Sequence, residues 1–141
     1  MRTLGIDYGR RRLGLAISDE GGILASPLPV YERQGEKKDL TFLSNLASER
    51  EAGRIVLGLP LNMDGSSGEM ADEVVAFAEA LREESGLPVV TFDERLTSVE
   101  AERVLVQANL SRKRRKGLRD SLSAVLILQG YLESLRGARV P

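Results

Sequence analysis

The order of hydrophobic patterns along the chain limits the folds open to it. Three extended segments come first, at Thr3–Asp7, at the alternating Leu13, Leu15 and Ile17, and at Ile23–Tyr31. The third contains two prolines, which cannot donate ladder hydrogen bonds, so we expect it at an edge of the sheet. Short links that contain glycine join the three segments and predict an antiparallel meander.

Helical and extended patterns then alternate. Helical spacing predicts a helix over 37–52, and another that starts after a Ser66/Glu69 capping box and ends at Gly86. Short apolar runs at Arg54–Leu59 and Val89–Phe92 predict buried parallel strands. The rest of the chain predicts a capped helix after Thr97, a basic loop at 111–117 and an apolar last helix over about 120–135.

This order predicts an α/β fold. Antiparallel strands that lead into strand–helix–strand units should give a mixed five-stranded sheet with helices on both faces. A chain of 141 residues that is 42% hydrophobic is expected to form one domain, 1–141.

The sequence contains no cysteine and no histidine. Disulfides, zinc sites built on thiolate or imidazole, and triads based on Cys or His are therefore excluded. Acid–base or metal chemistry must use carboxylates, Lys, Arg, Tyr, Ser or Thr. Oxygen ligands favour a hard ion, so any bound metal should be Mg²⁺ or Mn²⁺.

Basic residues are concentrated in two places. The sequence holds 20 basic and 21 acidic residues, and nine of the basic ones fall in Arg10–Arg12, Arg112–Lys116 and Arg119. A surface polarised in this way can attract a polyanion although the whole chain is near neutral. The alternative is that both runs are ordinary solvated loops.

Carboxylates stand at three informative places. Asp7 ends the first apolar run, Asp93 and Glu94 end the last one, and Asp120 opens the most apolar helix. Each of these residues also has an explanation that needs no site. Asp7 could start a turn, Asp93 and Glu94 could be ordinary strand-end polarity with one of them paired to Arg95, and Asp120 could be an N-cap. Successive strand residues face opposite sides, so only Asp93 or Glu94 should reach a shared site.

Three carboxylates that converge from distant parts of the chain suit a two-metal phosphodiesterase. Two divalent ions can activate a water and stabilise the leaving oxygen. Without the cations such a cluster is unfavourable, because like charges repel at short range. The nucleophile would then be water, and no His or Ser nucleophile is needed.

Four stretches of the sequence resemble one known family. IDYGRRRLGLAISD, GLPLNMDGSSG, FDERLTSVEAER and RDSLSAVLILQGYL occur in this order and together resemble the bacterial YqgF/RuvX family of pre-16S rRNA nucleases, related to Holliday junction resolvases. The resemblance implies a ribonuclease H-like fold and 5′-end processing of precursor 16S rRNA. Two small departures, Ser98 and Ser123, are not expected to abolish a metal site.

The resemblance also implies roles for particular residues. It makes Asp7, Glu94 and Asp120 the acidic metal ligands and catalytic residues. It matches Arg12 to the basic residue of the first motif and Asp19 to that motif's closing Asp, so Asp19 is a secondary candidate together with Asp93 and Arg95. We expect phosphate contacts from the basic runs, which comprise Arg10, Arg11, Arg12, Arg112, Lys113, Arg114, Arg115 and Lys116.

Other functions stay open at this point. The same chemistry could cut four-way DNA, or the chain could be a non-catalytic RNA- or ribosome-binding module. A sugar-kinase-like ATPase is disfavoured, because the chain is too short for two lobes. The N-terminus lacks the long apolar region of a secretory signal and no run could span a bilayer, so we expect a cytoplasmic protein, monomeric or homodimeric, without membrane contact.

Overall fold

The computed structural model describes residues 1–96 and 119–138. Within them lies a five-stranded sheet in the order β3-β2-β1-β4-β5. The strands are β1 (Arg2–Tyr8), β2 (Arg12–Ser18), β3 (Ala25–Glu32), β4 (Ala52–Leu59) and β5 (Val89–Asp93). The first three form an antiparallel meander with β3 at the edge, and β4 runs parallel to both β1 and β5. The predicted mixed sheet is therefore confirmed.

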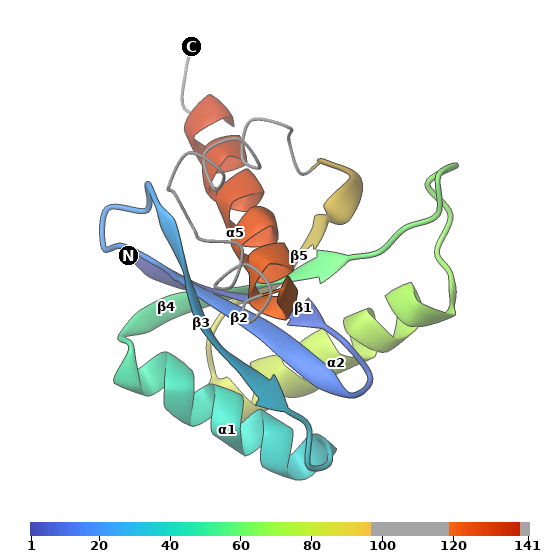
Figure 1. Ribbon diagram of the computed structural model, residues 1–141, viewed down its shortest axis with the longest axis horizontal. Helices are drawn as coiled ribbons and strands as arrows, with labels where there is room; N and C mark the ends of the chain where they lie inside the picture. Colours follow the sequence, from blue (N-terminus) through green and yellow to red (C-terminus); the bar gives the residue numbers. More distant parts are fainter. Residues whose placement is uncertain (97–118, 139–141) are drawn as a thin grey trace.

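Helices cover both faces of the sheet. The described ones are α1 (Glu36–Glu49), α2 (Glu69–Ser85), the short 3-10 helix η1 (Glu94–Leu96) and α5 (Arg119–Ala138). Figure 1 shows α1 and α2 on one face and α5 crossing the other. The helix expected after Thr97 and the basic loop at 111–117 lie outside the described residues. Across the described part of the chain, no helix is both long and apolar enough to cross a membrane.

Two apolar cores follow from the alternation of side chains along the strands. Leu4 and Ile6 of β1 pack with residues of α1 and α2 such as Leu43 and Phe77. On the opposite face, Val56 packs with α5 in a second cluster, which comprises Ala16, Val56, Phe92, Ala124, Val125, Ile127, Leu128 and Leu132. The sheet therefore holds α5 independently of the other two helices.

Two local predictions were wrong in detail. Helix α1 ends at Glu49 rather than 52, because the chain turns through Glu51, whose φ is 56°, directly into β4. The capping box at Ser66 is absent: the residue before α2 is Gly68, which makes no side-chain capping bond. The Ser66 hydroxyl donates to Asp64 instead, at 2.6 Å, which shows that a local turn took the place of the cap.

Candidate active site

A small cleft opens where the carboxyl ends of β1 and β5 meet α5. Its lining residues are Asp7, Glu94, Ser123, Leu126 and Ile127, and its volume is about 190 Å³. The two carboxylates come from parts of the chain 87 positions apart, since 94 − 7 = 87. The structure thus brings together two of the three acidic residues that the sequence nominated.

The pleat of β1 directs Asp7 toward α5. Gly5 is on the α5 face, because a Cβ built there would lie 2.8 Å from the Cβ of Leu128. Asp7 is two residues further along the strand and shares that face, whereas Ile6 between them is buried in the other core. The position opposite Asp7 on β2 is Gly14, which carries no side chain to cover it.

The same alternation separates Asp93 from Glu94. Phe92 packs in the α5 core and Glu94 lines the cleft, while Asp93 between them pairs with Arg95. The Arg95 Nη2 lies 2.7 Å from Asp93 Oδ2, and hydrogen bonds from Arg95 hold the pKa of the Asp93 carboxyl below its usual range. Arg95 also donates to the carbonyl of Met63 at 3.3 Å. Asp93 and Arg95 therefore form a surface pair beside the cleft.

Gly58 on β4 makes room for Glu94, and the sequence reasoning missed it. A Cβ at Gly58 would lie 2.5 Å from Glu94 Oε1 and 2.5 Å from Ile127 Cδ1. The glutamate side chain therefore lies directly over the backbone of β4. A glycine inside an otherwise apolar strand was the signal that could have revealed this close approach.

The environment of Glu94 disfavours its charge. Burial raises the pKa of the Glu94 carboxyl, and the negative charge of Asp93 raises it further. Asp7, a second carboxylate, lines the same cleft. A bound cation would offset both effects.

The third nominated carboxylate, Asp120, lies in the first turn of α5, inside the helix rather than before it. Its side chain is outside what the structure describes. Positions 120, 123 and 127 share one face of a helix, and Ser123 and Ile127 line the cleft. Considering only side chains that the structure describes, no group of three acidic residues is close enough to hold an ion.

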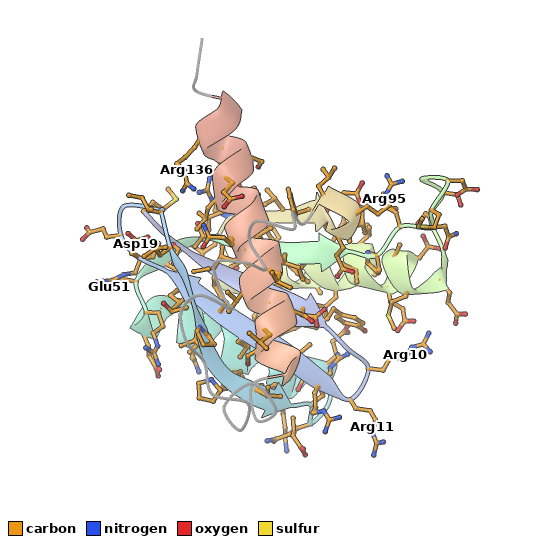
Figure 2. All side chains as sticks on the ribbon, turned by 45° about the horizontal axis from the view of Figure 1, so that its top comes forward. Arg10, Arg11, Asp19, Glu51, Arg95 and Arg136 are labelled. Carbon is orange, nitrogen blue, oxygen red and sulfur yellow. The ribbon has the colours of Figure 1, made fainter. Side chains whose placement is uncertain are left out.

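The arginine-rich hairpin between β1 and β2 borders the cleft. Asp7, Gly9, Gly14 and the three arginines line a neighbouring hollow of about 270 Å³. All three arginines are exposed, and Arg10 is engaged with α2, since its Nε donates to Glu73 Oε2 at 3.1 Å. Figure 2 shows Arg10 and Arg11 extending from this hairpin. The second basic run, Arg112–Lys116, lies outside the described residues.

Asp19 is not part of this site. β2 runs antiparallel to β1, so its last residue, Ser18, and the following Asp19 lie at the opposite end of the sheet from Asp7. Figure 2 shows Asp19 and Arg11 at the two ends. The Asp19 carboxylate accepts hydrogen bonds from the N–H groups of Ile23 and Leu24 at 2.7 and 3.0 Å. It therefore stabilises the turn into β3.

Comparison by sequence gives a consistent result over nearly the whole chain. The family model RuvX, described as Holliday junction resolvase, matches residues 1–134. A protein of Syntrophomonas wolfei named "Putative pre-16S rRNA nuclease" is 51% identical over 133 residues, which cover 94% of each chain. A protein of Desulforudis audaxviator with the same name is 44% identical over 139 residues, 99% of each chain.

Comparison by structure gives the fold. The T. thermophilus RuvC in complex with a Holliday junction substrate matches with a TM-score of 0.60 at 16% identity, over 97% of each chain. The fowlpox virus resolvase in complex with Holliday junction DNA matches with a TM-score of 0.59 at 12% identity, over 96% of this chain and 99% of that one. The expected ribonuclease H-like architecture is thereby confirmed.

Proposed function

This chain belongs to the RuvX family of nucleases, and from that premise we propose that its cleft hydrolyses phosphodiester bonds with divalent cations held by Asp7, Glu94 and Asp120. The observation that carries the proposal is the meeting of Asp7 and Glu94 in one cleft against α5. Residues 1–141 would form a single nuclease domain.

The donor set fits a hard divalent cation. Every candidate ligand is a carboxylate, which suits Mg²⁺ or Mn²⁺. A cation bound in the cleft that Asp7 and Glu94 line would favour the charged form of the Glu94 carboxyl, whose pKa burial raises. Asp120 would supply the third carboxylate, from the helix face that already borders the cleft through Ser123.

The roles of the chain's own residues follow from their places. Bound divalent cations supply charge neutralisation at the phosphate and activation of the attacking water. Asp7 on the sheet and Asp120 on α5 would hold them from two rigid elements, and Glu94 from a third. The exposed side chains of Arg11 and Arg12 would contact the phosphates that flank the scissile one, which positions a strand without reading its sequence.

Precursor 16S rRNA is the substrate that the relatives' names favour. We propose that this chain acts on that precursor, because proteins 51% and 44% identical carry the name of pre-16S rRNA nuclease, and that it acts at the 5′ end, which the family resemblance implies. With such a role the enzyme would act in the cytoplasm, with nucleic acid as its partner and without membrane contact. The description of the family model favours a second candidate, a four-way DNA junction.

The test compares Asp7→Asn with the wild type on both substrates. A 5′-extended 16S precursor RNA and a four-way DNA junction are incubated with Mg²⁺ or Mn²⁺, and products are mapped at nucleotide resolution. If Asp7 as a metal ligand lowers the activation barrier by about 4 kcal/mol, its loss should lower kcat roughly a thousandfold. Binding of either nucleic acid, measured in EDTA, should change little.

Asp19→Asn is the matched control, because it removes the same charge from the far end of the sheet. It should cleave like the wild type. Equal cleavage by the wild type and Asp7→Asn would refute the assigned mechanism. Binding by the wild type without cleavage under any metal condition would favour a non-catalytic binding module instead.

A further inference from the structure

A buried ionic network lies behind the arginine-rich hairpin, outside the cleft itself. Arg33 follows β3, and its side chain is only 13% exposed. Its Nε donates to Asp39 Oδ2 at 2.8 Å, and its Nη1 donates to the carbonyl of Gly9 at 3.2 Å. Its backbone N–H donates to the carbonyl of Arg11 at 3.0 Å. One residue thus holds the hairpin at two of its carbonyls.

Asp39 on α1 anchors this arginine. Its side chain is fully buried, and it accepts hydrogen bonds from the Tyr31 hydroxyl and the Gln34 N–H, both at 2.9 Å, as well as from Arg33. A buried ion pair is weak evidence for stability, because desolvation offsets most of the attraction. A network with this many directed bonds does fix the guanidinium in one orientation.

The aromatic side chains beneath complete the support. The guanidinium carbon of Arg33 lies 4.9 Å from the centre of the Tyr8 ring and 5.2 Å from that of Phe77. Tyr8 directly follows Asp7 in β1. The Arg33 side chain therefore links α1, α2 and the segment that carries the candidate metal ligand.

The hairpin that Arg33 holds is a tight turn that carries three arginines. A Cβ at Gly9 would lie 2.5 Å from the carbonyl oxygen of Arg12, so the turn has no room to spare. Arg10 is tied to Glu73 on α2, and Gly9 and Arg11 are held by Arg33 from the other side. Gly9 and the arginines line the 270 Å³ hollow that shares Asp7 with the cleft.

We propose that Arg33 is a positioning residue for binding of a nucleic-acid backbone: by holding the carbonyls of Gly9 and Arg11 it fixes Arg11 and Arg12 where the phosphates beside the cleft would lie. The proposal rests on the proposed function, which gives the place where the nucleic-acid strand would bind. Its physical basis is preorganisation, since a fixed hairpin does not lose conformational entropy when the strand binds. Arg33 itself does not touch the substrate.

Lysine cannot replace this arginine. The guanidinium donates to Asp39 and to Gly9 from separate nitrogens while its flat face rests on Tyr8. A lysine ammonium is a single point of charge on a flexible stem and cannot keep all three contacts in a fixed geometry. Arg33→Lys therefore keeps the charge and the backbone bond to the Arg11 carbonyl, and removes the guanidinium bond that holds the Gly9 carbonyl.

The experiment measures binding of a labelled single-stranded RNA and a DNA duplex to the full chain in EDTA, by fluorescence anisotropy between 50 and 300 mM KCl. We expect Arg33→Lys to raise Kd about tenfold at low salt and to reduce the slope of log K against log salt for the RNA by about 0.7, the loss of one phosphate contact. In cleavage assays with Mn²⁺, KM should rise while kcat stays within about twofold.

Arg54→Lys is the matched control. Arg54 is also a partly buried arginine, which donates to Thr3 Oγ1 at 3.2 Å and lies 5.0 Å from the Tyr131 ring, but it has no contact with the hairpin. It should lower the melting temperature without changing Kd or the salt slope. If Arg33→Lys fails to fold, Tyr31→Phe removes one of the bonds to Asp39 and should give a smaller change of the same kind.

Wild-type Kd and salt slope in a folded Arg33→Lys variant would overturn the proposal, and so would a fall in kcat at constant KM. Binding without cleavage by the wild type would defeat the proposed nuclease function alone. The Kd and the salt slope would still test the role of Arg33 in that case, because they are measured in binding experiments without cleavage.

Discussion

At the scale of single residues, the candidate site depends on the lack of a side chain at Gly58 as much as on the carboxylates of Asp7 and Glu94. The Glu94 side chain lies over the backbone of β4 at the point where Gly58 leaves space. Any side chain there would compete with it and with Ile127 for the same volume. The geometry of the cleft is therefore set by one glycine in the neighbouring strand.

Gly58→Ala should disable the site while leaving the fold in place. Its Cβ would come within 2.5 Å of Glu94 Oε1 and Ile127 Cδ1, so the glutamate must move out of the cleft. Overpacking of this kind costs about 1–3 kcal/mol of stability. We expect metal-dependent cleavage to fall more than tenfold, measured as kcat with saturating substrate.

Gly53→Ala provides the comparison within the same strand. The atoms its Cβ would meet belong to the flexible Met1 side chain, the nearest being Cγ at 2.9 Å, and they can move aside. This variant should cleave as the wild type does. Full activity in Gly58→Ala would show that Glu94 does not act from the position described.

The sequence was most informative where a charged residue ended an apolar strand. That pattern nominated Asp7 and the pair Asp93 and Glu94, because burial of a carboxylate requires a reason, and the family resemblance then selected Glu94 from the pair. The family resemblance added Asp19 as a secondary candidate, and the structure places Asp19 at the far end of the sheet. The antiparallel return of the second strand, itself predicted, would have been enough to separate Asp19 from Asp7.

At the scale of elements, the positions of strands and helices were predictable and their ends were not. Periodicity reports which face of an element is buried, and burial dominates its stability. Ends depend on single turns: Ser66 bonds with Asp64 rather than capping α2. Gly58 and the buried Asp39 were missed for a related reason, since their roles come from contacts between elements distant in sequence.

Helix α5 forms one wall of the cleft, and it is held there by packing against β1. Leu128 is fully buried, and its Cβ lies over Gly5. Leu128→Ala should cost about 2–5 kcal/mol, through lost burial and the cavity it leaves. Urea unfolding of wild type and variant measures this loss.

If α5 also supplies Asp120 to the site, the same variant should have a lower kcat even at temperatures where it is folded. Its matched control is Leu43→Ala, an equally buried leucine on α1 in the other core. That variant should lose similar stability and keep its kcat at temperatures where it is folded. Equal kcat values for the two variants would contradict a role for α5 in holding the site.

At the scale of the whole molecule, acid sensitivity should come from the buried Asp39. Burial alone would raise the pKa of its carboxyl, but bonds from the Gln34 N–H, Arg33 and Tyr31 outweigh burial, and the pKa lies below its usual range. A lowered pKa stabilises the folded state above the unfolded-state pKa of about 3.9, and this stabilisation is lost as the pH falls further.

Asp39→Asn should remove this part of the pH dependence. Its free energy of unfolding should be lower than that of the wild type at pH 7, and the difference should narrow as the pH falls below about 4. Urea unfolding at a series of pH values follows the difference. A difference that stays constant from pH 7 to pH 3 would mean that Asp39 has no lowered pKa in the folded protein.

Cation binding should also appear as a property of the whole molecule, without any substrate. An ion that binds only the folded state raises its stability by about 1.4 kcal/mol when present at tenfold its Kd. For a chain of this size, that corresponds to an increase of roughly 4 °C in melting temperature.

We expect this shift when Mg²⁺ or Mn²⁺ replaces EDTA, and we expect Asp7→Asn to lose it. Asp19→Asn should keep the full shift, since Asp19 lies at the far end of the sheet. The same shift in all three proteins would place the ion elsewhere and leave the cleft without its cofactor.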